Sequence, residues 1–308
     1  MQISGVTIQG GMNILPASGS PSPTPSYSFQ GSISGYAAGG SNGSTQVNVI
    51  NKFSFTSDGN GSDIGDLTES IWFSAGQSSS VSGYRSGGGT PTALNTIDKF
   101  PFASDGNATD VGDLTRAADS VAGQSSSASG YTSSDNPAGS TIDKFPFASD
   151  GNATDVGDLT VARASVAGQS SSDDGYSSGG YDGGFSNVID KFPFASDGNA
   201  TDVGDLTLAR QVPAGQSSTV SGYTSGGHSP TNVIDKFPFA SNANATDVGD
   251  LTASRFGPSG QSSTASGYTS GGDGAVNIID KFPFASDGNA TDVGDLANGL
   301  YGSSGTQV

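Results

Sequence analysis

The chain has 308 residues, with 11 lysines and arginines against 29 acidic residues and a net charge of -18 at neutral pH. Such a charge repels phosphate backbones and anionic lipid surfaces, which argues against nucleic acid as a partner. The absence of cysteine excludes disulfides, thiolate metal sites and thiol catalysis, and no stretch of eighteen apolar residues predicts a membrane helix.

The N-terminal part, residues 1–27, precedes the regular pattern. It has no basic and apolar leader of the secretory type, so we expect no signal sequence. Ser4–Gly11 (SGVTIQGG) is similar to strands found later in the chain, and we predict that it closes the fold. Pro16–Pro25 is rich in proline and serine, which predicts an extended connector.

A nineteen-residue module, IDKFPFASDGNATDVGDLT, organises the rest of the chain. It is present unchanged at Ile97–Thr115, Ile142–Thr160 and Ile189–Thr207, and three looser copies bring the total to six. The six lysines of the module are separated by 47, 45, 47, 45 and 45 residues. A period in the mid-forties is typical of propellers and solenoids, in which one unit buries its apolar face only against its neighbours.

Each repeat predicts four short strands and no helix, because glycine, proline, serine and asparagine interrupt every helical window. In one copy these strands are about Val121–Ser127, Ser129–Ser133, Thr141–Ala148 and Ala153–Leu159. Four strands per unit describe a propeller blade. Phe145 and Phe147 lie two residues apart, so both face the same side of their strand and are expected to pack between neighbouring blades.

The fold class is therefore all-β, a propeller of four-stranded blades. Residues 28–298 supply six blades, and we expect residues 299–308 to form a C-terminal closing strand. Pairing Leu300–Val308 with Ser4–Gly11 would assemble one further partial blade and remove the open sheet edge; a count of seven blades stays open as the alternative.

The order of these features resembles the kelch repeat of β-propellers. The matching residues are Gly-Asp-Leu-Thr-Val-Ala-Arg at 157–163, together with double glycines such as Gly87-Gly88 and Gly179-Gly180. The tryptophan of the kelch outer strand is absent, and valine stands there instead, as at Val156. The module is also similar to repeats of structural and tail-fibre-like proteins of marine cyanophages. This second resemblance implies a virion or extracellular location and carries no catalytic residue.

The basic residues occupy fixed repeat positions, which predicts an architectural role. Lys99 faces either Asp113 or Gly112 across its hairpin, depending on the turn length, so an acid such as Asp110 or Asp113 is expected beside it. The Asp-Gly-Asn loops offer oxygen ligands and Asn-x-Ser/Thr motifs. They lack the register and terminal glutamate of a calcium hand, and we interpret them as turns rather than calcium or glycan sites.

No residue stands out as catalytic. His228 is the single histidine and has no counterpart in other repeats, so a catalytic triad would rest on one loop residue. We expect no enzyme activity, no cofactor and no metal. The favoured function is a structural or adhesive module of a phage tail fibre or extracellular fibre, bound to fibre subunits, a host receptor or a glycan. The alternative is a multivalent lectin, with equivalent sites lined by tyrosine and aspartate at each blade junction.

The segments between the tyrosine strands and the next hairpins vary in length and sequence, while the hairpins do not. They include Ser133–Ser140, Ser178–Phe185 and Gly226–Thr231. Variable loops on a constant scaffold commonly carry recognition. We therefore predict a partner-binding rim made of Tyr181, Phe185 and His228.

Overall fold

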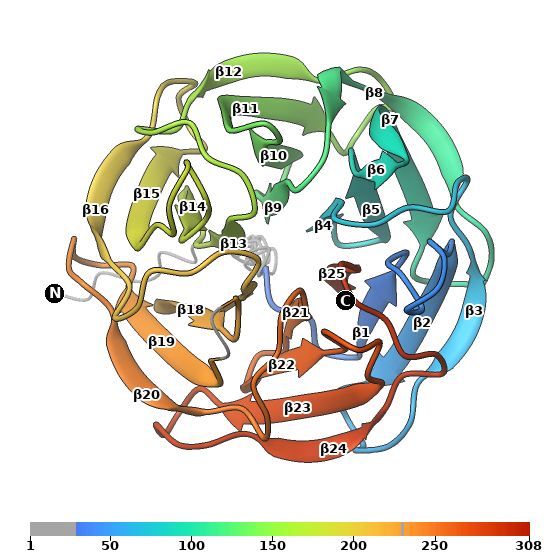
Figure 1. Cartoon of the computed structure of the whole chain (residues 1–308). Helices are drawn as coiled ribbons and strands as arrows, with labels where there is room; N and C mark the ends of the chain where they lie inside the picture. Colours follow the sequence, from blue (N-terminus) through green and yellow to red (C-terminus); the bar gives the residue numbers. More distant parts are fainter. Residues whose placement is uncertain (1–28, 229–230) are drawn as a thin grey trace, which may run out of the picture.

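The computed structural model describes residues 29–228 and 231–308, which form a ring of six sheets around a central axis (Figure 1). These residues contain 25 strands and no helix. The six blades are predicted correctly, and all neighbouring strands within a blade are antiparallel. Within the described ranges, no helix is long and apolar enough to span a membrane.

From the axis outward, blade one consists of β25 (Ser304–Gln307), β1 (Ser34–Ala38), β2 (Val49–Ser54) and β3 (Ser62–Asp66), and blade two of β4 (Ala75–Ser78), β5 (Ser82–Ser86), β7 (Thr92–Pro101) and β8 (Thr109–Ala118), with β6 (Gly89–Thr90) paired to β7. Blade three consists of β9 (Ala122–Ser125), β10 (Ser129–Asp135), β11 (Gly139–Pro146) and β12 (Thr154–Asp158), and blade four of β13 (Ala167–Ser170), β14 (Asp174–Ser178), β15 (Val188–Pro193) and β16 (Thr201–Asp205). Blade five consists of β17 (Ala214–Ser217), β18 (Ser221–Ser225), β19 (Val233–Pro238) and β20 (Thr246–Asp250), and blade six of β21 (Ser259–Ser262), β22 (Ser266–Ser270), β23 (Ile278–Pro283) and β24 (Thr291–Asp295).

The aromatic residues of the repeat pack between blades, as the sequence predicted. Tyr84 of β5 stacks on Phe147 of the next blade with ring centroids 4.8 Å apart, and its ring also contacts Phe145 at 5.6 Å. Phe145 is buried, and Gly130 beside it leaves the room that its ring occupies. The same arrangement recurs at all six junctions, so each blade buries its apolar face only through its neighbour.

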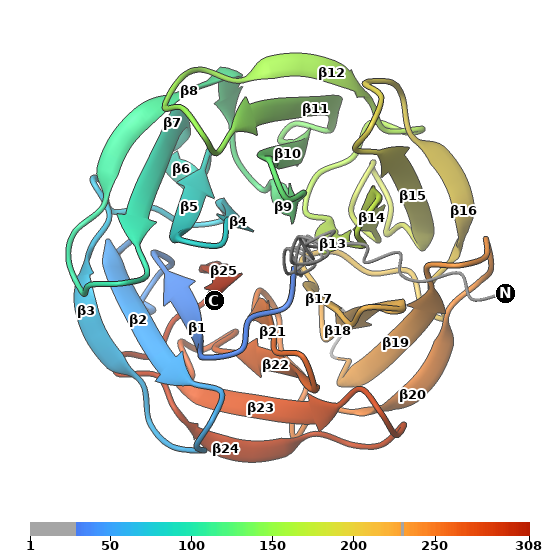
Figure 2. The same ribbon diagram turned by 180° about the vertical axis from the view of Figure 1, so that it is seen from behind.

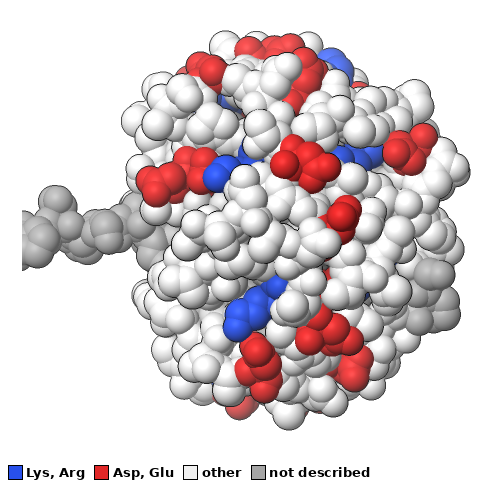
Figure 3. All heavy atoms as spheres, turned by 90° about the vertical axis from the view of Figure 1, so that its left-hand side faces the viewer, with Lys and Arg blue, Asp and Glu red and all other residues white. Residues whose placement is uncertain are grey.

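The expected partners of the lysines were wrong. Thr109 stands opposite Lys99 in the β7–β8 register, and the ammonium of Lys99 lies 2.9 Å from Asp150 in the next blade rather than beside Asp110 or Asp113. A bulge between Ile97 and Asp98 shifts this register. Five junctions carry this ion pair, and Figure 3 shows basic side chains beside acidic ones on the outer wall.

The sixth lysine pairs differently because its junction has lost the acid. Asn242 replaces aspartate in the turn that Lys191 would contact, and Lys191 lies 3.7 Å from Asp174 of its own blade instead. Asp174 in turn stands where the other blades have serine. Two departures from the repeat thus compensate each other, and the local charge balance is kept.

The C-terminal segment closes the ring, but not as a separate partial blade. Strand β25 is the innermost strand of blade one, where it pairs with β1, so residues from both ends of the described chain complete one four-stranded sheet. The described residues thereby fill all four positions of every blade. The predicted closing strand Ser4–Gly11 and the connector Pro16–Pro25 lie outside the described residues.

Glycine makes the axial packing possible. Each inner strand carries one glycine, and a methyl group at any of the six would collide with the backbone of the preceding inner strand, as at Gly123 against Gly76. These contacts run in a closed circle that includes Gly305 of the C-terminal strand against Gly260. The inner strands can therefore meet around the axis only if this position has no side chain.

Candidate interaction surface

The two faces of the ring differ in their connections. One face, here called the loop face, carries the segments between the second and third strands of each blade and those that lead from one blade to the next. The opposite turn face carries tight turns, such as residues 79–81 of blade two. Figure 2 views the turn face, on which the segment before β1 runs out from near the axis. The variable segments all belong to the loop face.

The structure brings the three predicted rim residues together on the loop face. Tyr181 and Phe185 lie between β14 and β15 with 41% and 40% of their surface exposed, and His228 follows β18. The ring centroids are 6.2 Å apart for Tyr181 and Phe185, and 5.0 Å apart for Phe185 and His228. Two loops of neighbouring blades thus present one continuous aromatic surface.

Backbone contacts hold these side chains in place. The amide of Tyr181 donates to the carbonyl of Ala164 at 2.8 Å, and the amide of His228 donates to the carbonyl of Gln211 at 2.8 Å. Gly183 has φ of 112° at the tip of the first loop, which only glycine adopts without strain. Both loops are therefore fastened to the connecting segments beside them.

The aromatic surface extends beyond the predicted residues. His228 contacts Phe256 at 5.5 Å between centroids, Phe256 contacts Phe73 at 6.5 Å, and Tyr301 lies between Phe73 at 6.0 Å and Trp72 at 5.8 Å. We call this set of seven residues the aromatic crescent: Tyr181, Phe185, His228, Phe256, Phe73, Tyr301 and Trp72. It runs from the rim at blade four toward the axis and on to blades one and two.

A signal for the missed residues was present in the repeat. Trp72, Phe256 and Tyr301 occupy one repeat position, three residues before the first residue of the inner strand, where the other blades have aspartate, alanine and glutamine. Three aromatic residues at one variable position indicate a specialised sector. These residues could not be grouped with the predicted rim from the sequence, because the loop before the inner strand and the loop after the tyrosine strand belong to different blades. Only the closed ring places these two loops side by side.

A central channel runs along the axis of the ring, and its mouth lies beneath the crescent. Six residues with a left-handed backbone conformation surround this mouth. One residue from each of the six connections has positive φ, between 51° and 67°: Phe73, Ser120, Ser165, Val212, Gly257 and Gly302. Each of their amides donates to the carbonyl of the preceding member, at 2.6 to 3.2 Å, and the amide of Phe73 donates to Gly302 to complete the circle. Six backbone hydrogen bonds thus form a closed cycle.

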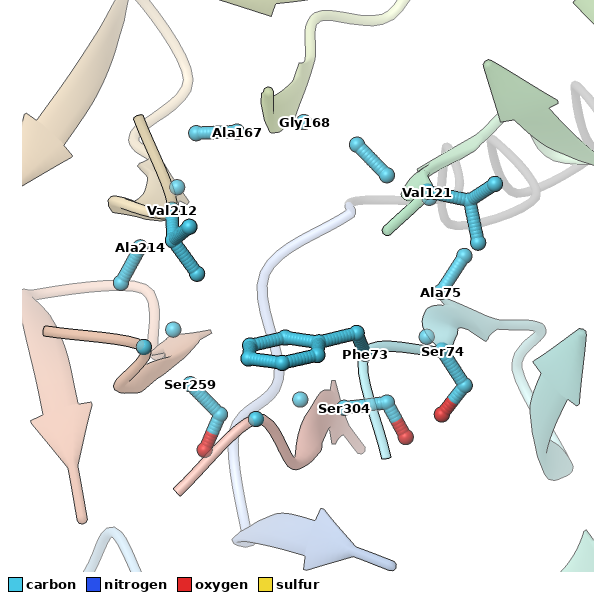
Figure 4. A pocket seen from close by; sticks show the side chains of 18 of the residues that line it. Phe73, Ser74, Ala75, Val121, Ala167, Gly168, Val212, Ala214, Ser259 and Ser304 are labelled. Atoms are coloured by element: carbon cyan, nitrogen blue, oxygen red, sulfur yellow. The ribbon is translucent and has the colours of Figure 1, made fainter. Parts of the chain in front are cut away.

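This cycle aims two apolar side chains at the axis. In Figure 4, Phe73 and Val212 extend toward the middle of the pocket, which is lined by the first residues of all six inner strands and has a volume of about 100 Å³. Left-handed conformation is unfavourable for such residues and for a β-branched one above all. Strain of this kind is often retained where it positions a side chain, and here it places Phe73 at the centre of the loop face.

The tyrosines of the repeat are not available at the surface. All six are buried between blades, where burial raises the pKa of Tyr36 to about 12, assisted by the nearby charge of Asp105. Their faces are already covered by phenylalanine rings. The expectation that each blade junction offers an equivalent sugar site lined by tyrosine is therefore wrong, because these rings hold the blades together.

The Asp-Gly-Asn loops use their polar atoms inside the fold. The side-chain oxygen of Asn107 accepts a hydrogen bond of 3.1 Å from the amide of Asp66 in the preceding blade, and Asp110 accepts one from Gly112. The asparagine contact recurs at all six junctions. Among residues 29–228 and 231–308, no three acidic or histidine side chains are grouped so that they could share a metal ion.

Comparison with known proteins adds no relative. No protein-family model matches the sequence, and no curated protein matches it. The likeness to kelch repeats therefore stays a likeness of motifs.

Proposed function

We propose that this propeller is a non-enzymatic structural or adhesive module that holds a partner on its loop face through the aromatic crescent. One observation carries the proposal. The chain keeps its hairpins, junctions and inner strands nearly constant, whereas the segments that vary in length and sequence lie on the loop face and include seven contiguous rings.

The sector around blade four is the most apolar part of this surface. Val161 and Leu208, in the connections on either side of that blade, are 42% and 48% exposed and add aliphatic surface to the exposed rings of Tyr181 and Phe185. Exposed apolar clusters and aromatic anchors on a rigid scaffold are typical of protein contact surfaces. His228 contacts Phe185 in a tilted arrangement and Phe256 edge to face, which favours a role in packing rather than in proton transfer.

We place the module in a virion appendage, such as a tail fibre, or in an extracellular fibre. Its motif likeness to cyanophage structural repeats supports this location. The net charge of -18 supports partners other than nucleic acid or an anionic membrane. The partner would be another fibre subunit or a receptor or glycan on a host surface.

A single carbohydrate site on the crescent is a second candidate. Asp182 lies in the same loop between the exposed rings of Tyr181 and Phe185, so a carboxylate and two aromatic faces are available to one sugar. A glycan array distinguishes this candidate, since it predicts one binding site per chain rather than the six of a multivalent lectin.

The test of the proposal replaces Tyr181, Phe185 and His228 together with serine. Attachment or assembly should weaken at least tenfold while the thermal midpoint stays within a few degrees, because these side chains lie on the surface. The matched control replaces Val81 and Val220 with serine, since both are 66% exposed but lie on the turn face. Unchanged attachment and assembly of the triple variant would contradict the proposal, and detection in purified virions would support the location.

A further inference from the structure

We propose that the aromatic crescent of one copy binds the proline-rich segment Pro16–Pro25 of a second copy, so that copies of this chain join head to tail. This inference rests on the proposed function, since it names the occupant of the same surface. It is argued from where the chain enters the ring, from how far the segment reaches and from the chemistry of the two surfaces.

The described chain begins on the turn face, close to the axis. The side-chain amide of Gln307 in the innermost strand donates to the carbonyl of Phe29 at 2.9 Å, and the amide of Gly31 donates to the carbonyl of Ser262 at 2.8 Å. Both contacts lie at the end of the inner strands that faces away from the crescent. The proline-rich segment therefore starts from the face opposite to its proposed binding surface.

The prolines at positions 21, 23 and 25 lie too close in sequence to Phe29 to reach the crescent of their own ring around the outside. Four strands at a spacing of about 4.8 Å give a radius of about 19 Å, and a five-residue strand is about 17 Å long. A path from the axis out to the rim and along the outer wall to the loop face is therefore about 36 Å, and a return to the axis makes it about 55 Å. The eight residues from Pro21 to Phe29 span at most about 28 Å. Along the axis, Phe73 and Val212 occupy the channel mouth. The crescent that this segment can occupy belongs to another molecule.

The composition of the segment suits the surface. Prolines stand at positions 16, 21, 23 and 25, and the first charged side chain of the whole chain is Lys52. Proline-rich stretches favour the polyproline II conformation and dock on rows of exposed aromatic rings at a small loss of entropy. An uncharged segment also avoids the repulsion that an acidic ring of net charge -18 exerts on anionic ligands.

The geometry predicts an open assembly. The donor segment starts on the turn face and the acceptor crescent lies on the loop face, so each bound copy still offers one free segment and one free crescent. Contacts between two different surfaces of this kind generate filaments unless the rotation between copies closes a ring. A fibre component built in this way extends along the propeller axis.

Sedimentation velocity of the full chain over a range of concentrations tests the inference. The wild type should form a series of oligomers that grows with concentration. A crescent variant, Phe185→Ser with Phe256→Ser, and a segment variant, Pro21→Ser with Pro23→Ser and Pro25→Ser, should each remain monomeric. An equimolar mixture should form dimers and nothing larger, because only one productive pair of surfaces remains.

Several results would overturn the inference. A wild type that stays monomeric would do so, and so would a segment variant that still associates, since that association would be symmetric or use another surface. A labelled peptide of residues 16–28 should bind the segment variant and lose at least tenfold in affinity for the crescent variant. Glycan binding without peptide binding would identify a sugar as the occupant and contradict the inference.

The same variants separate this inference from the proposed function. If the crescent variant loses attachment while the wild type never associates, the crescent is a partner surface but its partner is not a second copy. If the wild type associates, both variants stay monomeric and the crescent variant also loses attachment, both statements stand. Near-ultraviolet circular dichroism of both variants serves as the folding control, since the rings packed between blades are unchanged.

Discussion

At the scale of single residues, the repeat contains a buried charge position that the blades satisfy in different ways. In blades four to six an aspartate in the third strand pairs with an arginine of the preceding connection, as in Arg210 and Asp235 at 2.8 Å, both fully buried. Blade two supplies Arg85 from its own second strand to Asp98. Blade one has Asn51 and needs no cation, while blade three keeps Asp143 with Ala118 where the arginine would stand.

Asp143→Asn and Asp235→Asn are predicted to differ in effect although they alter the same repeat position. Among the described residues, Asp143 accepts hydrogen bonds from Thr115 alone, which asparagine can also satisfy, so the free energy of unfolding at pH 7 should change by less than about 1 kcal/mol. Asp235→Asn leaves Arg210 buried without a counter-charge and should lower the free energy of unfolding by about 3 to 5 kcal/mol. Urea denaturation measures both, and equal losses would contradict this account.

The stability difference between the wild type and Asp143→Asn should also depend on pH. Burial raises the pKa of Asp143, against the opposing hydrogen bonds from Thr115, so the folded state binds the proton more tightly than the unfolded chain. The stability that the protonated carboxyl contributes is present below the unfolded pKa of about 3.9 and is lost as the pH rises through the raised folded pKa. Relative to Asp143→Asn, the wild type should therefore lose stability from pH 4 upward, and a gain over that range would contradict the sign.

Val212 at the channel mouth gives a third prediction at this scale. Its φ is 54°, and the equivalent residues of two other connections are Gly257 and Gly302. Val212→Gly should therefore be more stable than Val212→Ala by about 1 kcal/mol, because alanine keeps the left-handed strain and glycine removes it. Thermal denaturation of the two variants is the measurement, and an alanine variant as stable as the glycine variant would show that the backbone there is not strained.

At the scale of the strand, the third strand of each blade links its blade to both neighbours. In blade three, Phe145 packs under Tyr84 of the preceding blade, while Lys144 pairs with Asp197 of the following one at 2.9 Å. Alternation of side chains along the strand assigns these two tasks to opposite faces. The repeated module is therefore a two-sided connector between blades as well as a hairpin.

Phe145→Ala should lower the free energy of unfolding by about 3 to 5 kcal/mol, because a fully buried ring is removed and Gly130 beside it cannot fill the space. The control is Val220→Ala on the turn face, which should change it by less than about 0.5 kcal/mol since that side chain is 66% exposed. Equilibrium unfolding in urea compares the two. A loss below about 1 kcal/mol for Phe145→Ala would show that the ring is not part of the core.

At the scale of the whole molecule, stability depends on cycles that close only when all six blades are present. The glycine contacts around the axis return to their starting point through Gly305 of β25, and the six amide hydrogen bonds at the channel mouth do so through Gly302, just before that strand. The amide of Gln307 also donates to the hydroxyl of Ser78 in blade two at 3.0 Å, which completes a ring of inner-strand contacts. Removal of one strand therefore breaks several cycles at once.

Deletion of residues 300–308 should lower the thermal midpoint of the entire ring rather than that of blade one alone. The deletion removes β25, opens the edge of β1 and interrupts each cycle, and stacked repeats share their stability through such interfaces. Scanning calorimetry should show the loss as a shift of the main transition. A truncated chain that melts at the parental temperature would show that closure contributes nothing.

The sequence by itself determined the blade, because the spacing of Phe145 and Phe147, the glycine turns and the repeat period are local and periodic properties. It also pointed to Tyr181, Phe185 and His228 as residues outside the repeat. The lysine partners, the place of the C-terminal strand and the full crescent could not be predicted in this way. Lys99 reaches Asp150, and Phe73 reaches Phe256 and Tyr301, across junctions that exist only once the ring has closed and residues of different blades share one surface.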